Sequence, residues 1–405
     1  MPIKVNSEVG ALKRVLLHKP GKELLHLVPE SLSRLLFDDI PFLDIAQEEH
    51  DFFAEKLREN GAEVLYLEDL VAEVLNMDSD IKDKFIAEFI DESGAVAGVY
   101  REELKEFLGS IHDAKELVLA TMTGVTLKEL SKKPKSKLAA MLQTDGSFVL
   151  DPIPNLYFTR DTFSSIGTGV SLNKMYSATR RRESIYGRFI FSYHPQYKSV
   201  HRYFNIDSPY PIEGGDILVL NKSTILVGIS QRTAPEAIEE FARNLFSDEN
   251  STFKNVIAIE IPRSRAFMHL DTVFTQIDYD KFTVHPGIIS TLRCFEITSK
   301  NSEILVNELH LKLEDLLAKY LEIDKVQIIY CGGNDSIAAQ REQWNDGSNT
   351  LCIAPGKVVV YDRNTVTNQL LLDSGIECIK IHSSEISRGR GGPRCMSMPF
   401  EREEL

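Results

Sequence analysis

Residues 388–395, near the C-terminal end, have the composition of a reactive loop. They read RGRGGPRC, and the three glycines and the proline force a tight turn whose backbone can come close to a bound molecule. Arginines beside a thiol favour the thiolate, which is the nucleophilic form of cysteine. We therefore expect Cys395 to be a nucleophile whose thiolate form is favoured.

The other cysteines lack this setting. Cys352 and Cys378 lie in apolar runs typical of a core, and Cys331, which precedes two glycines, is the rival nucleophile. Five widely spaced cysteines are typical of free thiols in a reducing compartment. The sequence has no signal peptide pattern and no apolar stretch of the roughly 18 to 20 residues that a membrane helix needs. We expect a cytoplasmic protein.

Three further segments place polar side chains beside expected strand ends or glycine turns. They are residues 155–161 (NLYFTRD), 213–216 (EGGD) and 269–271 (HLD). Residues two apart in a strand share a face, so we expect His269 and Asp271 to project into one space. Taken alone, a histidine at a strand end is more often structural than catalytic.

A thiol, a histidine and several carboxylates together suit a cationic electrophile. A peptide-cleaving thiol enzyme needs a histidine and an orienting group, but not this many acids. A guanidinium is flat, forms paired hydrogen bonds with carboxylates, and resists attack until its charge and the nucleophile are positioned. Asp161 and Asp271 have the right side chains to hold one. The competing interpretation of residues 388–394 is an RGG-type RNA-binding tail, which a single repeat supports poorly.

Strands and helices of an α/β protein must position these residues. The pattern predicts strands at residues 12–17 and 62–67 with a helix at 44–60 between them. Residues 70–142 are rich in Leu, Ala, Glu and Lys, which indicates inserted helices. After Gly146, Asp161, Asp216 and Asp271 each open an apolar strand, at two intervals of 55 residues. The apolar strand pairs are expected in residues 147–157, 217–229, 272–284 and, less regularly, 347–361, which predicts a radially repeated α/β unit.

The overall composition excludes several classes. The 405 residues carry a formal net charge of -14, with 43% hydrophobic and 26% charged residues. These proportions are globular, and the acid excess argues against a protein that binds nucleic acid through bulk positive charge.

The motifs together closely resemble the arginine deiminase family of the guanidine-modifying superfamily. They are FTRD at 158–161, EGGD at 213–216, HLDTVF at 269–274 and RGRGGPRCMSMP at 388–399. The resemblance implies a five-bladed pseudo-symmetric α/β propeller of the pentein type with an inserted all-helical domain. Residues 1–70 and 146–405 would form the propeller, and residues 71–145 the insertion.

The resemblance also implies a reaction and the roles of its residues. Cys395 would attack the guanidinium carbon of L-arginine, and His269, oriented by Glu213, would protonate the departing ammonia and then activate water. Asp161 and Asp271 would hold the guanidinium nitrogens. The products would be L-citrulline and ammonia, with no metal and no organic cofactor. We expect the partners to be the small-molecule substrate and further copies of the chain in a homo-oligomer, without nucleic acid or membrane.

Five more residues match positions that contact the rest of the substrate in the family. Asn155, Arg180 and Arg232 would bind the substrate carboxylate, Phe158 would pack on its aliphatic stem, and Arg390 would close over the site. Without the resemblance, Arg180 belongs to a run of three arginines typical of a solvated face, and Arg232 could cap a helix that begins near Pro235.

Two alternatives to this function stay open on the sequence. One is a related guanidine enzyme, namely an agmatine deiminase, a dimethylarginine hydrolase or an amidinotransferase. The other is a non-catalytic protein that binds arginine or RNA on the same scaffold.

Overall fold

The first strand–helix–strand unit follows the expected pattern. The structure is a computed structural model that describes residues 2–130, 138, 144 and 146–405. β1 spans Leu12–Leu17, α2 spans Leu43–Glu59 and β2 spans Glu63–Tyr66. Gly61, just after α2, has a φ of 86°, the left-handed conformation that commonly ends a helix. β2 then pairs in parallel with β1, as the short unit requires.

Five sheets share one pairing pattern. In each, the middle strand is antiparallel to one neighbour and parallel to the other. Their strands, in order across each sheet, are β19-β1-β2 (Met398–Arg402, Leu12–Leu17, Glu63–Tyr66), β5-β6-β7 (Phe163–Ile166, Gly169–Leu172, Arg202–Phe204), β8-β9-β10 (Ile217–Asn221, Thr224–Ile229, Asn255–Glu260), β11-β12-β15 (Phe274–Gln276, Lys281–Val284, Gln327–Tyr330) and β16-β17-β18 (Leu351–Ala354, Lys357–Tyr361, Glu377–Ile381). The expected repetition of an α/β unit is therefore present.

The unit β19-β1-β2 joins the two ends of the chain. β19 lies antiparallel to β1, with Val15 opposite Pro399 and Leu16 opposite Met398. A unit made from both ends cannot appear as a contiguous repeat in the sequence, so the sequence pattern indicates only three or four units. The strand pair expected at residues 147–157 is wrong, because β4 (Phe148–Leu150) pairs with β3 (Val125–Thr126), while β5 pairs with β6.

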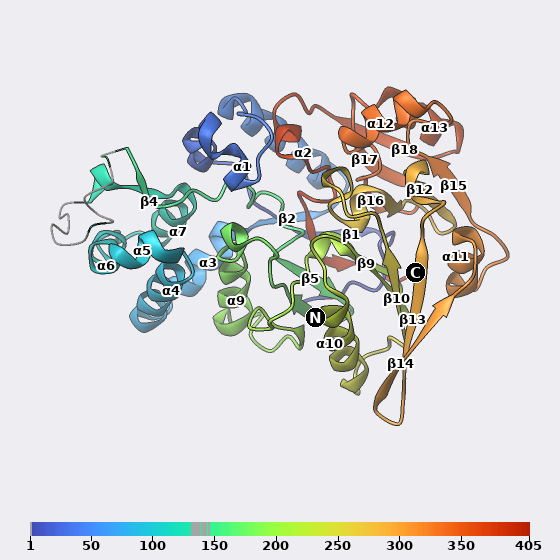
Figure 1. The fold of residues 1–405 in the computed structure, drawn as a ribbon, viewed down its shortest axis with the longest axis horizontal. Coiled ribbons are helices and arrows are strands. Elements are labelled where there is room, and N and C mark those ends of the chain that lie inside the picture. The colour runs from blue at the N-terminus through green and yellow to red at the C-terminus, as the bar shows by residue number, and fades with distance from the viewer. Residues whose placement is uncertain (1, 131–137, 139–143, 145) are drawn as a thin grey trace.

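Helices connect the middle strand of each unit to its third strand. α2 does so between β1 and β2, and the other connections contain α9 (Glu183–Tyr193), α10 (Pro235–Ser247), α11 (Leu313–Leu321) and α13 (Thr365–Asp373). The connection with α11 also holds the hairpin β13 (Arg293–Lys300) and β14 (Glu303–Leu309), which extends the sheet of β10 and projects from the lower edge in Figure 1. α12 (Ser336–Trp344) follows β15, and the short α1 (Leu32–Leu35) precedes α2.

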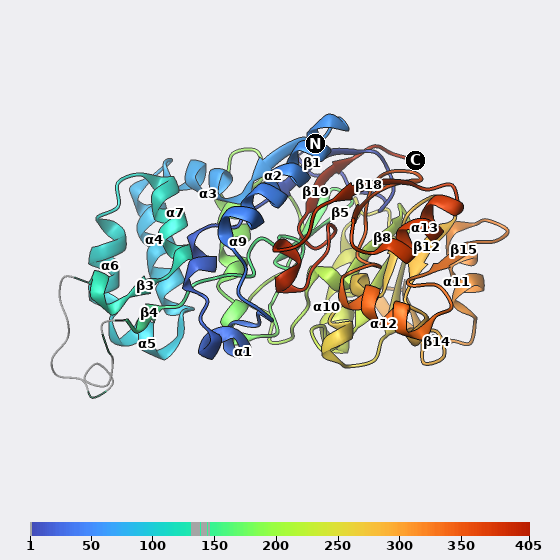
Figure 2. The same cartoon turned by 90° about the horizontal axis from the view of Figure 1, so that it is seen from above.

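The helices between β2 and β3 gather at one side of the molecule (Figure 1 and Figure 2). They are α3 (Leu67–Leu75), α4 (Ser79–Asp91), α5 (Gly94–Val99), α6 (Arg101–Gly109) and α7 (Ala114–Thr123). Part of the expected insertion, residues 131–137, 139–143 and 145, lies outside the described residues. Among the described helices, none is long and apolar enough to cross a bilayer.

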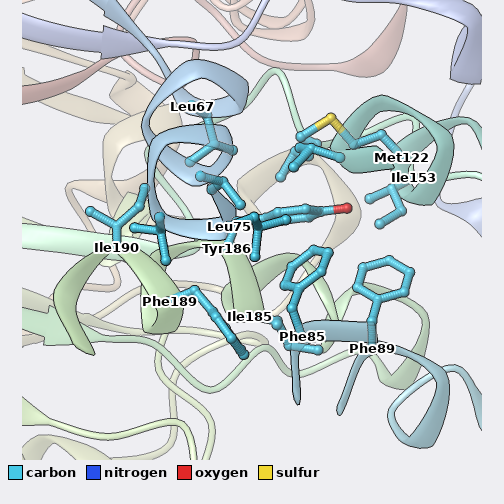
Figure 3. Packing of buried hydrophobic residues seen from close by; sticks show 14 of the residues in the cluster. Leu67, Leu75, Phe85, Phe89, Met122, Ile153, Ile185, Tyr186, Phe189 and Ile190 are labelled. Carbon is cyan, nitrogen blue, oxygen red and sulfur yellow. The ribbon is translucent and has the colours of Figure 1, made fainter. Parts of the chain in front are cut away.

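A large apolar cluster fixes these helices to the strand-bearing part. Phe85 and Phe89 of α4 pack against Tyr186 and Phe189 of α9, with Phe85 and Phe189 edge to face at 5.2 Å (Figure 3). The buried hydroxyl of Tyr186 lies 3.0 Å from the hydroxyl of Thr121, so it is not left without a partner. Each such ring contributes about 1.5–3 kcal/mol by burial, which ties α4 and α7 to α9.

Candidate active site

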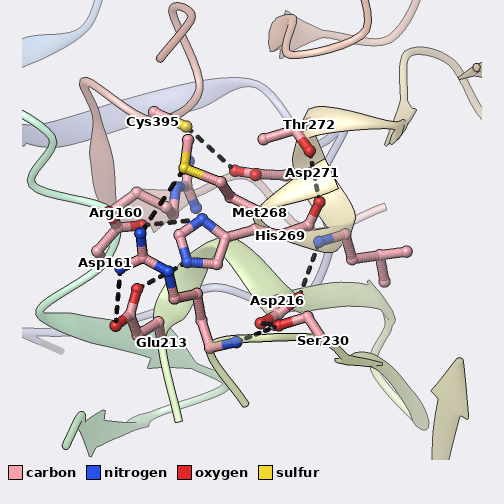
Figure 4. A network of polar contacts seen from close by, with 12 residues as sticks. Arg160, Asp161, Glu213, Asp216, Ser230, Met268, His269, Asp271, Thr272 and Cys395 are labelled. Carbon is pink, nitrogen blue, oxygen red and sulfur yellow. Dashed lines mark hydrogen bonds and ion pairs between the residues drawn. The ribbon is translucent and has the colours of Figure 1, made fainter. Parts of the chain in front are cut away.

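A buried polar residue stands just before the first strand of every unit. These residues are Asp161 before β5, Asp216 before β8, Asp271 before β11, Asn349 before β16 and Cys395 before β19. The 55-residue intervals between the three aspartates therefore reflect the repeat of the fold. Asp161, Asp216, Asp271 and Cys395 lie around one site (Figure 4). Asn349 belongs to the same site, because its side chain accepts a hydrogen bond from the Cys395 backbone.

Cys395 is buried among carboxylates. Its Sγ lies 3.6 Å from Asp271 Oδ2, and its backbone N–H donates to Asn349 Oδ1 at 3.0 Å. Burial raises the pKa of the Cys395 thiol well above its usual range, and the carboxylates of Asp271, Asp161 and Asp346 raise it further against the opposing charge of Arg394. The expectation that arginines favour the thiolate is therefore wrong for these side chains, because burial and the nearby acids together outweigh the charge of Arg394.

The remaining thiols do not rival Cys395 as the nucleophile. All five cysteines are free, as expected. Burial raises the pKa of Cys331 to about 11 and that of Cys352 to about 12. Cys331 lies against the Thr367 hydroxyl at 3.5 Å. Cys352 contacts the carbonyl oxygens of Ile277 and Ala354, so the hydrogen-bond partners of these two thiols are a hydroxyl and backbone carbonyls.

Asp161 and Asp271 each keep one oxygen without a hydrogen-bond partner. Asp161 Oδ2 accepts from Arg180 Nη1 at 2.9 Å, and Asp271 Oδ2 accepts from Arg394 Nη1 at 2.7 Å. Their Oδ1 atoms are buried acceptors with no donor, although His269 Nδ1 lies 3.8 Å from Asp161 Oδ1. Buried carboxylate oxygens are normally hydrogen-bonded, so the pair has capacity for a cation with several N–H groups.

His269 and Glu213 form a buried pair. His269 Nε2 lies 2.8 Å from Glu213 Oε2 (Figure 4). Burial disfavours the charged imidazole, but the carboxylates of Asp161, Glu213 and Asp216 outweigh it and raise the pKa of His269 to about 9. Burial also opposes the Glu213 anion, but Arg232, His269 and Arg180 lower the pKa of Glu213 to about 2. A protonated imidazole is therefore held beside an ionised acid at neutral pH.

The local structure around His269 differs from the expected strand. Residues Leu270–Thr272 form a short 3-10 turn that His269 precedes. His269 and Asp271 still reach the same site, but through this turn rather than through a shared strand face. The Leu270 N–H donates to Asp216 Oδ1 at 2.8 Å, and burial raises the pKa of Asp216 to about 6. Asp216 thus fixes the turn that carries both residues.

The glycines of the motifs leave room for these side chains. A Cβ on Gly215 would lie 2.6 Å from the His269 ring. A Cβ on Gly391 would collide with the Phe158 ring, and one on Gly392 would lie 2.5 Å from the Asn349 carbonyl oxygen. The loop can therefore approach Asn349 and Phe158 closely because these positions are glycine.

A cavity of about 330 Å³ leads to Arg232 and Arg390. Nε and Nη1 of both arginines are buried donors without hydrogen-bond partners. Arg232 is buried and is not a helix cap on the surface, although α10 does begin at Pro235. Two cationic groups with unused donors at one cavity suit an anion such as a carboxylate.

The other expected substrate contacts have partners within the chain. Asn155 Nδ2 donates to the Leu35 carbonyl at 2.6 Å, and Phe158 is buried with its ring centroid 4.1 Å from that of Tyr157. Arg180 is buried, so it does not belong to a solvated face. Its guanidinium contacts Glu183 and Asp161 and is not among the groups that line the cavity of Arg232. Its expected place at the substrate carboxylate therefore differs from its observed contacts.

Sequence reasoning missed three residues of the site. Arg394 is fully buried, donates to Glu8 at 3.0 and 3.1 Å, and so ties the N-terminal segment to Asp271. Asn349 donates to the Asp271 carbonyl at 3.1 Å and accepts from the Cys395 backbone. Arg394 adjoins the nucleophile in the sequence and was available as a signal, whereas Asn349 and Glu8 have no distinguishing pattern.

Among the described residues, Asp161, Glu213 and His269 form the one group whose ligand atoms could hold a metal ion. These atoms lie within 4.8 Å of one another. The same atoms face Arg180 at 2.9 and 4.0 Å and each other. The guanidinium of Arg180 already lies beside the oxygens of Asp161 and Glu213, so these three residues are better suited to a delocalised cation than to a metal ion.

Solved structures share this fold at low sequence identity. An amidinotransferase from Microseira wollei superimposes with a TM-score of 0.57 at 15% identity, covering 100% of this chain and 98% of its own. DDAH from Pseudomonas aeruginosa, complexed with citrulline, superimposes with a TM-score of 0.53 at 14% identity, covering 96% of this chain and 100% of its own. At these identities the likeness establishes the α/β fold class of the chain.

The sequence comparisons resolve the family within that class. The family described as arginine deiminase matches residues 33–402. An arginine deiminase from Treponema denticola is 54% identical over 406 residues, covering 100% of this chain and 99% of the relative. The chain therefore belongs to the arginine deiminase family.

Proposed function

We propose that this chain hydrolyses L-arginine to L-citrulline and ammonia, with Cys395 as a covalent nucleophile. The observation that carries the proposal is the buried thiol beside two carboxylates, Asp161 and Asp271, that each have an oxygen free to accept a hydrogen bond. A guanidinium placed between them would satisfy both oxygens and bring its carbon to the sulfur.

The two ends of the substrate suit the two ends of the site. Asp161 and Asp271 take the guanidinium, and Arg232 and Arg390 take the carboxylate with their unused donors. Phe158 packs on the aliphatic stem, and Asn155 assists at the carboxylate end. For Arg180, the ion pair with Asp161 favours a role in holding that carboxylate.

Substrate charge activates the nucleophile in this proposal. The carboxylates around Cys395 raise the pKa of its thiol, and a bound guanidinium neutralises part of that charge. The thiol then gives its proton to Asp271 Oδ2, its nearest acceptor at 3.6 Å. The thiolate attacks the guanidinium carbon, forming a carbon–sulfur bond and a neutral tetrahedral adduct.

His269 acts first as an acid and then as a base. Its imidazolium protonates one amino group of the adduct, the carbon–nitrogen bond breaks, and ammonia leaves a thiouronium cation on Cys395. The neutral imidazole then takes a proton from water, whose oxygen attacks the same carbon. The second adduct expels the sulfur as a thiolate, which takes its proton back from Asp271 Oδ2. The hydroxyl proton passes to solvent, and citrulline is released. Glu213 stabilises the imidazolium both before it gives up its proton and after it takes one from water.

We also propose the finer organisation of the chain. The five units of shared pairing are arranged as a five-bladed propeller, formed by residues 1–70 and 146–405, with residues 71–145 as a helical insertion. The enzyme works in the cytoplasm as a homo-oligomer on a small-molecule substrate. Its own acids, thiol and imidazole supply the chemistry without a metal or organic cofactor.

Citrulline formation by the purified protein tests the proposal. We expect ammonia and citrulline in equal amounts from L-arginine, and Cys395→Ser should abolish both while L-arginine binding persists. Cys331→Ser is the matched control and should retain turnover. An amidino group passed to an added amine would indicate a transferase instead, and binding of L-arginine without citrulline would indicate a non-catalytic protein.

A further inference from the structure

Trp344, the single tryptophan of the chain, lies face to face with Arg390. The Cζ atom of Arg390 is 3.4 Å from the centroid of the Trp344 ring system, which is van der Waals contact. A guanidinium in this position is attracted by the electron density of the ring face. The pair sits beside the cavity that Arg390 and Arg232 line.

The stack leaves the hydrogen-bonding edge of Arg390 unused. The N–H groups of a guanidinium lie in its plane, so contact through one face occupies none of them. Nε and Nη1 of Arg390 have no hydrogen-bond partner, and the nearest acid among its ion pairs, Asp38, is 3.8 Å from Nη1. An arginine without the stack could turn toward Asp38 and pair with it. The indole keeps the guanidinium available.

The backbone of Arg390 is held in an uncommon conformation. Its φ of 64° lies in the left-handed region, which a residue with a side chain adopts at a cost. Such a conformation persists where contacts with the surrounding structure hold it. Trp344 supplies one such contact across the cavity rim.

Trp344 is itself fixed relative to the nucleophile. It is the last residue of α12, and the following turn is held by the Asn364 side chain, which donates to the Asn345 carbonyl at 2.9 Å. The same connection runs on to Asn349, whose side chain contacts both Asp271 and Cys395. The backbone that carries the half-exposed indole therefore belongs to the segment that also positions the reacting groups.

We propose that Trp344 is a positioning residue for substrate recognition, whose indole holds Arg390 with its N–H edge directed to the α-carboxylate of the substrate and stays stacked in the complex. The inference rests on the proposed function, since it assumes that the cavity takes the carboxylate of L-arginine. It makes Trp344 a determinant of the preference for arginine over guanidines without a carboxylate.

Ligand binding to Cys395→Ala protein, which cannot form the covalent adduct, tests this role. Calorimetry would compare L-arginine with agmatine, which has the guanidinium but no carboxylate. We expect Trp344→Leu to weaken L-arginine binding roughly 3- to 30-fold and to leave agmatine binding unchanged. Trp344→Phe, which keeps an aromatic face, should restore most of the affinity. Phe52→Leu is the matched control. It removes another aromatic ring that lies under a cation, with Lys56 Nζ 5.0 Å from the ring centroid, and Phe52 does not line this cavity. The substitution should change the affinity for neither ligand.

Two results would overturn the proposal. Unchanged L-arginine affinity in Trp344→Leu would show that the stack does not matter, and equal losses for both ligands would show a general structural effect. In enzyme with Cys395 present, Trp344→Leu should raise KM for L-arginine with kcat within about twofold, since a positioning effect on the carboxylate acts on binding.

The fluorescence of the single tryptophan tests whether the stack persists. We expect Arg390→Ala to shift the emission of Trp344, and L-arginine added to the Cys395→Ala protein to leave it nearly unchanged. A shift with L-arginine as large as that in Arg390→Ala would show that Arg390 leaves the indole, and the proposal would fail. Protein with Cys395 present that binds L-arginine but forms no citrulline would refute the proposed function, and the binding comparison in Cys395→Ala protein would still test the role of Trp344.

Discussion

Asp161 and Asp271 are tethered in the same way on opposite sides of the reacting groups. In each carboxylate, Oδ2 is ion-paired to an arginine of the chain, Arg180 at 2.9 Å and Arg394 at 2.7 Å, while Oδ1 has no hydrogen-bond partner. The tethers fix the orientation of each acid, and the remaining oxygens are left for a ligand. A planar cation with N–H groups on two edges matches this arrangement.

Asp161→Asn and Asp271→Asn should each reduce kcat/KM for L-arginine on the order of 100-fold or more, because each removes a preorganised charge from the reacting centre. Steady-state citrulline assays would measure both. Asp207→Asn, an exposed acid paired with Arg188, is the control and should keep its activity. Loss in one aspartate variant with normal turnover in the other would contradict a two-sided clamp.

Asp271→Asn should also make Cys395 more reactive toward a small alkylating reagent at neutral pH. The carboxylate of Asp271 raises the pKa of the thiol, so its removal lowers that pKa and increases the thiolate fraction. The pH dependence of iodoacetamide labelling at Cys395 measures the change, with Cys331→Ser protein to exclude labelling of the second candidate. A midpoint that stays or moves to higher pH would disprove the electrostatic assignment.

Glu213→Gln should move the alkaline limb of the kcat profile to lower pH. The pKa of His269 is raised to about 9, with Glu213 among the carboxylates responsible. In the proposed mechanism the imidazolium protonates the departing amino group of the adduct, so activity falls as pH rises through this value. Without the Glu213 charge the fall should begin about one pH unit lower. If the alkaline limb stays at the same pH while kcat falls at every pH, the limb reports the titration of a group other than His269.

Arg232→Ala should raise KM for L-arginine about 10- to 100-fold, as expected for a lost charged hydrogen bond. Turnover of a guanidine without a carboxylate should suffer less. Arg263→Ala is the control, because Arg263 lines the same cavity but is exposed and should have a smaller effect. Equal losses on both substrates would count against a carboxylate contact at Arg232.

Gly392→Ala should lower kcat on the order of 100-fold, because a Cβ 2.5 Å from the Asn349 carbonyl must displace the segment that holds the Cys395 backbone. Gly98→Ala, in α5 with nothing within 4 Å of the added Cβ, is the control. It should retain full activity and gain about 0.5–1 kcal/mol of stability in urea unfolding. Similar kcat values in the two variants would refute the packing argument.

The sequence predicted most reliably those features that follow from local pattern. β1 was expected at the residues where it lies, and α2 within one residue at each end. The three aspartates at regular intervals pointed to strand starts, because each of their units is formed by one continuous segment of the chain. The unit that pairs β19 with β1 could not be predicted by such reasoning, because its strands lie at opposite ends of the chain.

Within the site, charges that add across distant segments escaped prediction. Cys395 was identified as the nucleophile candidate from its neighbours in the loop, yet those neighbours gave the wrong direction for its pKa. Burial is the largest cause of the raised pKa, and the carboxylates that add to it are those of Asp271, Asp161 and Asp346, which lie 124, 234 and 49 residues away in the sequence. The ion pair of Arg394 with Glu8 likewise depends on tertiary folding.

The pairing of β19 with β1 has a consequence for how the protein is made. Synthesis proceeds from the N-terminus, so β1 leaves the ribosome long before its antiparallel partner exists. The segment that carries Cys395 immediately precedes that partner. A nascent chain therefore cannot complete the unit of β1, or bring Cys395 to the proposed site, until it has been synthesised through β19. Products that stop before β19 are expected to lack both the strand partner and the proposed nucleophile.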